Sequence, residues 1–205
     1  MRNTSTLHLS LIQEIDLLWE PVYPYLAHQI QELFGRQDGN VLEIGPFCGV
    51  IFSLERMKIG RSFLIGTFST GMSSFFRKEI ENKNLKDRIK VIETDSSLKD
   101  LDREQFDLVI FRGAFFFPSL FQVNVSSIDR VLSKNGMAFV GGVFGKYTPE
   151  GVIQEIGKRS RDLNLQIGKV EVKEEALRQE VEKSGIKGTW KILSEGGLWI
   201  VMRKD

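Results

Sequence analysis

The sequence contains few of the residues that build disulfides or metal sites. Cys48 is the only cysteine, and His8 and His28 are the only histidines in 205 residues. A single cysteine excludes an internal disulfide, and a zinc site made of cysteine and histidine ligands is not expected. We therefore predict that the chain holds no metal.

A charge excess and long apolar segments are also missing. The chain has 28 basic and 27 acidic residues and a formal charge of +1, which provides no field toward nucleic acid or membranes. Its longest apolar runs, such as 114–120 with Pro118 and Ser119 inside it, are far shorter than the roughly 20 residues that span a bilayer. Residues 1–5 lead into no apolar signal segment. We expect a cytoplasmic protein without nucleic-acid or membrane partners.

The first forty residues predict two helices. Ser10 is expected to cap the first helix, and Pro21 ends it. The second helix ends at Gly35 and the turn 37–39. Apolar residues recur along both segments at helical spacing: Ile12, Ile15 and Leu18 in the first, and Val22, Leu26, Ile30, Leu33 and Phe34 in the second. We predict that residues 1–39 form a helical lid or extension.

Beyond residue 40, apolar strands alternate with helices. Strands are expected at 41–44, 62–67, 88–93, 106–111 and 137–142, with helices after residue 50 and at 72–83 and 123–132. A strict alternation of this kind predicts parallel strands joined by right-handed crossovers.

The last third departs from the alternation. Helices are expected at 149–163 and 174–184 and strands at 189–193 and 198–203. The segment between these two strands is too short for a crossover helix, so they should form an antiparallel hairpin. We predict one α/β domain over residues 40–205, with a seven-stranded, mostly parallel sheet and helices on both faces.

Residues 41–49, with the sequence VLEIGPFCG, predict a buried strand that runs into a ligand-binding turn. Gly45 and Gly49 permit backbone conformations or close approaches that a β-carbon would prevent. The helix that follows would present backbone N–H groups and a partial positive charge to a ligand. Turns 67–69, 95–97, 112–117 and 141–145 should lie at the same edge of the sheet and surround one cleft.

The order of these segments resembles that of the class I S-adenosylmethionine-dependent methyltransferases, over roughly residues 20–205. Glu43, Gly45 and Gly49 match the opening motif of that family, and Phe47 stands where its middle glycine is usual. Four later segments are similar in order and spacing: IGTFSTGM, TDSS, FDLVIFRGAFFFP and IDRVLSKNGMAFVGG.

This resemblance implies a methyl transfer from S-adenosylmethionine to a nucleophile. Gly45–Gly49 would lie along the methionine part of the cofactor, and Glu43 would help to fix its amino group. Asp95 would bind the adenine amino group, and Arg112 would sit near the sulfonium. The implied cofactor-binding residues are Glu43, Gly45, Pro46, Phe47, Gly49, Phe68, Ser69, Asp95, Ser96, Arg112 and Gly113.

Two departures from the family pattern favour an alternative, a catalytically inactive methyltransferase-like binding or accessory protein. Phe47 places a large ring in the glycine turn. Phe68 stands where the family has a carboxylate that accepts both ribose hydroxyls. A nicotinamide-dependent reductase is disfavoured, because the sequence has neither a Gly-x-Gly-x-x-Gly turn nor a Tyr-x-x-x-Lys pair.

The substrate is expected to be a small molecule with an apolar or aromatic part. The Asp/Asn-Pro-Pro-Tyr signature of methyltransferases acting on amino groups is absent after the fourth strand, and specificity should reside in residues 146–169. Each residue also has a structural alternative: capping for the acids, a salt bridge for Arg112, and core packing for 115–117. No general base is nominated, and a homodimer is compatible with the sequence. The expected substrate-binding residues are Trp19, Tyr23, Phe115, Phe116 and Tyr147.

Overall fold

A computed structural model describes residues 6–205, apart from the side chains of Thr6, Leu7 and Thr70. Residues 1–5, on which the prediction about a signal segment was made, lie outside the described residues. No helix in the described part of the chain is long and apolar enough to cross a membrane.

Seven strands form one mixed sheet in the order β3-β2-β1-β4-β5-β7-β6. The strands are β1 (Asn40–Ile44), β2 (Ser62–Thr67), β3 (Ile89–Glu93), β4 (Phe106–Arg112), β5 (Leu132–Val143), β6 (Thr189–Leu193) and β7 (Gly197–Arg203). The first five are parallel, and β7 pairs antiparallel with both β5 and β6. The predicted sheet and its terminal hairpin are confirmed.

Two hydrophobic clusters cover the two faces of the sheet, because alternate strand residues point to opposite sides. Val41 and Leu108 belong to one cluster, and their neighbours Leu42 and Val109 belong to the other. The first face carries α2 (Tyr23–Phe34), α3 (Val50–Arg56) and α4 (Thr70–Asn82). The second face carries α5 (Val125–Val131) and α7 (Glu174–Ser184).

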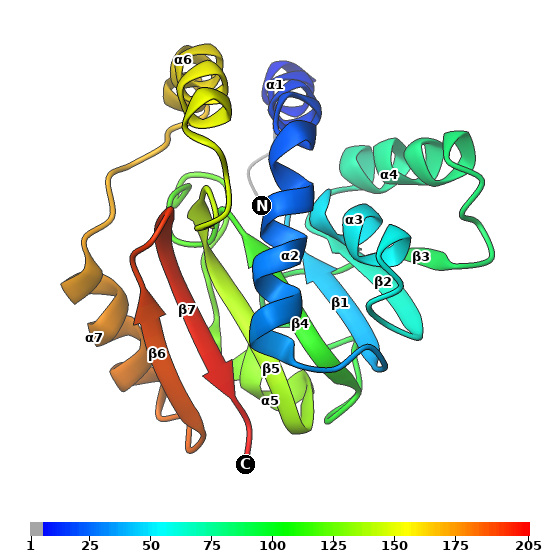
Figure 1. Ribbon diagram of the computed structural model, residues 1–205, viewed down its shortest axis with the longest axis vertical. Coiled ribbons are helices and arrows are strands. Elements are labelled where there is room, and N and C mark those ends of the chain that lie inside the picture. Colours follow the sequence, from blue (N-terminus) through cyan, green and yellow to red (C-terminus); the bar gives the residue numbers. More distant parts are fainter. Residues whose placement is uncertain (1–5) are drawn as a thin grey trace.

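The carboxyl ends of the parallel strands are covered by two helices that stand side by side, α1 (Thr6–Leu18) and α6 (Glu150–Gln166) (Figure 1). A short 3-10 helix, η1 (Glu20–Val22), joins α1 to α2. Apolar residues of α1 and α2 belong to the same cluster as residues of the sheet. The N-terminal helices therefore pack over the edge where the ligand cleft was expected.

Three details differ from the sequence prediction. Helix α1 begins at Thr6, so Ser10 lies inside the helix and not at its N-cap. The chain passes from β3 to β4 without a helix, so the alternation is not strict. The predicted turn at 133–136 lies inside β5, where the pairing with β4 shifts between Phe106 and Leu108, because these residues bulge without ending the strand.

Candidate active site

The strand order reverses at β1, whose neighbours are β2 on one side and β4 on the other. In open α/β sheets, ligands bind beyond the carboxyl ends of the strands at such a reversal. The turns that follow β1 and β4 meet here, so Gly45, Phe47, Arg112 and Gly113 lie close together. A β-carbon on Gly113 would lie 2.9 Å from the Phe47 ring.

The turn 45–49 is covered by protein side chains. All residues from Val41 to Val50 are buried. A β-carbon on Gly49 would lie 1.9 Å from the ring of Tyr23, and one on Gly45 would lie 2.8 Å from the ring of Phe111. Gly45 also has a φ of +108°, which residues with a side chain rarely adopt. Both glycines are therefore required by the packing of aromatic rings in this conformation.

Glu43 joins the end of β1 to the start of α3. Its two carboxyl oxygens accept hydrogen bonds from the backbone N–H groups of Val50 at 3.3 Å and Ile51 at 2.7 Å. Burial raises the pKa of Glu43 to about 8, and the hydrogen bond from Ile51 offsets part of this rise. The side chain thus caps the N-terminus of α3, the structural alternative named for it above.

Arg112 lies at the centre of a buried polar group. Its Nη2 donates to Asp16 Oδ1 at 3.0 Å and to the Tyr23 hydroxyl at 2.7 Å, and the Tyr23 hydroxyl donates to Asp16 Oδ1 at 2.6 Å. The guanidinium carbon also lies 5.3, 4.9 and 5.1 Å from the ring centres of Trp19, Tyr23 and Phe47. Cation–π contacts of this kind stabilise a desolvated guanidinium.

Burial governs the titration of this group. It raises the pKa of Asp16, and the Arg112 charge offsets part of the rise. It also raises the pKa of Tyr23 well above the usual value for tyrosine. The Tyr23 hydroxyl is therefore protonated at neutral pH, and it acts as a donor to Asp16 and an acceptor from Arg112.

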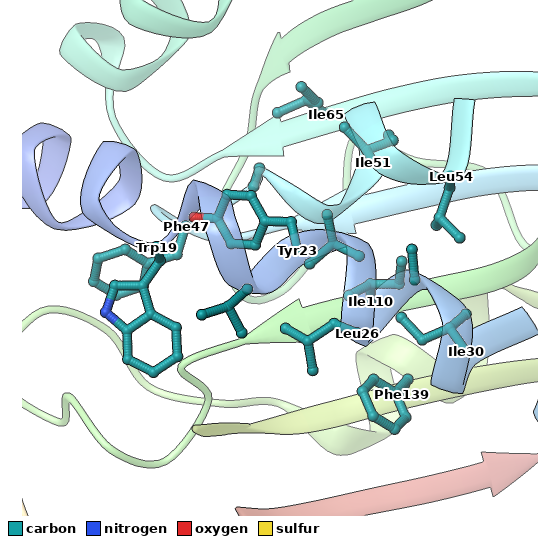
Figure 2. Packing of buried hydrophobic residues seen from close by; sticks show 14 of the residues in the cluster. Trp19, Tyr23, Leu26, Ile30, Phe47, Ile51, Leu54, Ile65, Ile110 and Phe139 are labelled. Atoms are coloured by element: carbon teal, nitrogen blue, oxygen red, sulfur yellow. The ribbon is translucent and has the colours of Figure 1, made fainter. Parts of the chain in front are cut away.

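Figure 2 shows Tyr23 with its hydroxyl oxygen near Phe47 and Trp19. The Phe47 ring is fully buried and packs on Phe117, with ring centres 5.1 Å apart. Residue 47 is not among those with a positive φ, so the strain that a ring could cause in a glycine turn does not arise. The Tyr23 ring covers Gly49, and Phe47 packs against Phe117 and Gly113.

The end of β2 is aromatic as well. Phe68 is half-buried and packs edge-on against Phe111 and Phe121, with ring centres 5.5 and 5.7 Å apart. Ser69 is the N-cap of α4, where its hydroxyl accepts a hydrogen bond from the Met72 N–H at 3.4 Å. Neither side chain offers a carboxylate at this strand end.

Asp95 and Ser96 follow β3 on the surface. Asp95 is exposed, and its Oδ1 accepts hydrogen bonds from the Ser97 N–H at 2.8 Å and from the Ser97 hydroxyl. These hydrogen bonds lower the pKa of Asp95. Asp95 is therefore an ionised carboxylate at neutral pH and is accessible from solvent.

The predicted substrate residues do not all lie together. Trp19 and Phe116 line the same two cavities, whereas Tyr23 belongs to the Arg112 group. Phe115 packs against the cluster on the other face of the sheet. Tyr147 is exposed, stacks on His28 at 4.6 Å and donates a hydrogen bond to Glu32.

The two cavities lie beside Trp19. The larger one, about 500 Å³, extends between α6, the segment 169–172 and the adjoining ends of β5 and β7. The smaller one, about 20 Å³, is lined by Trp19, Phe47, Arg112, Asn164 and Lys169, among others. Asp16 was not predicted as a site residue, and Asn164 and Lys169 were predicted only as part of the specificity segment 146–169. The burial of Asp16 could have been predicted from the sequence, because Asp16 lies one residue after Ile15 and three before Trp19, on the apolar side of its helix.

Comparisons with solved structures define the class of fold. Comparisons with models of known families and with curated proteins gave no match. Solved structures do match. A candidate S-adenosyl-L-methionine-dependent methyltransferase of Methanococcus maripaludis has a TM-score of 0.78 at 22% identity, over 100% of this chain and 96% of the other.

Two further structures are similar over most of their length. A SAM-dependent methyltransferase from Aquifex aeolicus has a TM-score of 0.64 at 16% identity, over 95% of this chain and 96% of the other. Geranyl diphosphate C-methyltransferase from Streptomyces coelicolor, in complex with Mg²⁺, geranyl diphosphate and S-adenosyl-L-homocysteine, has a TM-score of 0.59 at 11% identity, over 88% and 78%. The chain therefore has the class I methyltransferase fold, as the resemblance of its motifs predicted.

Proposed function

We propose that the protein is an S-adenosylmethionine-dependent methyltransferase acting on a small molecule with an apolar or aromatic part. One observation carries the substrate class: a cavity of about 500 Å³ lies at the carboxyl end of the sheet, beside the segment that follows β4. Its lining includes Trp19, Phe116, Phe144 and Leu198. Small-molecule sites commonly have about 300–1,000 Å³ and mostly apolar walls.

The residues at the sheet edge offer polar groups that suit the cofactor. In the present arrangement of the N-terminal helices, however, side chains block part of the space that the cofactor would need. Asp95 offers an accessible carboxylate for the adenine amino group, and Ser96 offers its backbone N–H. The rings of Tyr23 and Phe47 occupy the path along Gly45–Gly49. Binding therefore requires the rings of Tyr23 and Phe47 to leave this path, which breaks the contacts of the Tyr23 hydroxyl with Asp16 and Arg112. When bound, S-adenosylmethionine would supply an electrophilic methyl group.

The chain's own contribution would be placement and the exclusion of water. Trp19 and Phe116 form an apolar wall that the two cavities share. Holding two reactants in line can replace much of the entropy cost of a bimolecular encounter. A nucleophile that arrives deprotonated then needs no base from the protein, and we assign none. A cytoplasmic location and a small-molecule partner belong to the same proposal.

Calorimetric titration with S-adenosylhomocysteine tests the cofactor site. We expect binding by the wild type and weaker binding by Asp95→Ala, with the melting temperature of the unliganded protein unchanged within a few degrees, because an exposed acid contributes little to stability. Asp100→Ala, also an exposed aspartate in the segment between β3 and β4, is the control. Absence of heat from the wild type at high micromolar ligand would contradict the proposal.

A second candidate is a binding or accessory protein that keeps the fold without catalysis. It is favoured by the buried hydrogen-bonded group of Asp16, Tyr23 and Arg112, together with the aromatic packing at Phe68. In this case the closed arrangement would be permanent. Amide hydrogen exchange then would not change when S-adenosylhomocysteine is added, whereas the enzyme proposal predicts changed protection in α1 and α2.

A further inference from the structure

Two buried N–H donors beside the small cavity have no acceptor among the described residues. Trp19 and Arg112 are each only 4% exposed. Trp19 Nε1 and Arg112 Nε form no hydrogen bond within the described residues. Buried donors are nearly always paired, because an unpaired donor loses its hydration without compensation. Two such donors near one another indicate that an acceptor from outside the chain belongs between them.

Trp19 and Arg112 both line the small cavity. Its volume of about 20 Å³ exceeds slightly the roughly 10–15 Å³ that one water-sized group needs. Figure 2 shows the Trp19 indole with its nitrogen on the side away from Leu26 and Ile30, so the donor does not face the core of the cluster. The space is therefore suited to one oxygen atom.

The small cavity shares Trp19, Phe116, Val143, Asn164 and Lys169 with the large one. A ligand whose body fills the large cavity could thus extend one polar atom toward the two donors. The large cavity is apolar at Phe116, Val143 and other residues, so the polar atom would be the end of a mostly apolar molecule.

Lys169 adds a positive charge at this junction. Its Nζ lies 5.8 Å from the centre of the Phe116 ring, and it forms no ion pair with any carboxylate of residues 6–205. Burial lowers the pKa of Lys169. Arg161 and Glu171 also line the large cavity, and both are exposed. Arg112 is already paired with Asp16, so the half-buried Lys169 is the cation at this junction that has no acidic partner in the described part of the chain.

We propose that the substrate of this protein has an apolar body that carries a carboxylate, and that one carboxylate oxygen binds between Trp19 Nε1 and Arg112 Nε, next to Lys169. That the bound carboxylate is a substrate rests on the proposed function, but the carboxylate site itself does not depend on the cofactor. An anion accepts stronger hydrogen bonds than a neutral group and pairs with the lysine. An amide of the same shape lacks the charge and binds less well.

The test uses the series of phenylalkanoates from phenylacetate to 5-phenylpentanoate and the matching amides, titrated into the full chain without cofactor. We expect at least one carboxylate to bind and its amide to bind about tenfold more weakly, as charge-assisted hydrogen bonds predict. Trp19→Phe removes one donor and should weaken the binding of both acid and amide, because the amide oxygen also accepts a hydrogen bond. Lys169→Met removes the charge and should weaken carboxylate binding about tenfold while changing amide binding less than twofold. Lys158→Met, on the exposed part of α6, is the matched control and should change neither.

Several results would overturn the site. Equal affinity for acid and amide, or no binding by any member of the series, contradicts it. If the two donors only hold a water molecule, Trp19→Phe will leave carboxylate affinity unchanged. Circular dichroism establishes that each variant is folded. S-adenosylhomocysteine titration of the same samples separates the two proposals: its binding without carboxylate binding defeats only the site, and the reverse result defeats only the enzyme function.

Discussion

Asp16 of α1 and Arg112 at the end of β4 form an ion pair at 3.0 Å, and each side chain is only 5% exposed. The two residues are 96 positions apart in the sequence. Their pair connects the N-terminal helices to the edge of the sheet where open α/β folds bind their ligands. It is therefore a contact that must be broken if α1 and α2 are to move away from the turn after β1.

Asp16→Ala should lower the free energy of unfolding by about 3–5 kcal/mol, because it leaves the Arg112 charge buried without its counter-ion. Urea unfolding at pH 7 measures the change. Glu20→Ala is the control, since Glu20 is 58% exposed and pairs with Lys83 on the surface; it should cost less than about 1 kcal/mol. Equal losses for the two variants would show that burial of the Asp16–Arg112 pair has no special effect on stability.

Tyr23→Phe should increase the affinity for S-adenosylhomocysteine by up to about tenfold. The change removes the hydroxyl that donates to Asp16 and accepts from Arg112, while the ring stays. If the closed arrangement is less stable, less of the binding free energy of the ligand is used to open it, and the observed affinity rises. Calorimetry measures the affinity, with Tyr25→Phe, a half-buried residue of the same helix, as the control. Unchanged affinity would mean that the Tyr23 hydroxyl does not keep the turn covered.

Glu43 predicts a pH dependence of stability. Its pKa is about 8 in the folded protein and 4.5 when unperturbed, so between these values the folded state binds a proton that the unfolded state lacks. The contribution of this group to the free energy of unfolding is therefore largest below pH 4.5. It falls as the pH rises to 8, by up to roughly 4–5 kcal/mol. Glu43→Gln should remove this part of the slope.

Urea unfolding of wild type and Glu43→Gln at pH 5 and pH 9 measures that slope. Relative to the wild type, the free energy of unfolding of Glu43→Gln should be higher at pH 9 than at pH 5. Glu182→Gln, the same change at an exposed site of α7, should have the same pH dependence as the wild type. Parallel curves for wild type and Glu43→Gln would indicate that the buried carboxyl titrates near its ordinary value.

Phe68→Asp should strengthen S-adenosylhomocysteine binding if the cofactor lies across the end of β2, because it restores a carboxylate for the ribose hydroxyls. Phe68→Asn has a similar size without the charge and should bind more weakly than the aspartate variant. Both variants should unfold at a lower temperature than the wild type, since both lose the packing on Phe111 and Phe121. Equal binding by the two variants would place the ribose elsewhere.

The sequence predicted the order and type of most elements because these depend on local pattern. Helix α7 begins and ends where it was predicted, at Glu174 and Ser184, because its apolar spacing and the glycine that follows are both local signals. The predicted end of the second helix at Gly35 is explained by a left-handed φ of 72° there. The bulge at 133–136 was not predicted, because it depends on the pairing of β5 with β4.

The sequence by itself determined that the chain builds a methyltransferase-type sheet with a glycine turn after its first strand. The spacing of apolar residues, the turn residues and the order of both are local features of the sequence. Only the tertiary structure decided what lies against that turn. Tyr23 covers Gly49, Asp16 pairs with Arg112, and Trp19 meets Lys169 across a small cavity. Periodicity shows that such residues are buried, but which buried groups meet depends on how helices from distant parts of the chain pack over the sheet.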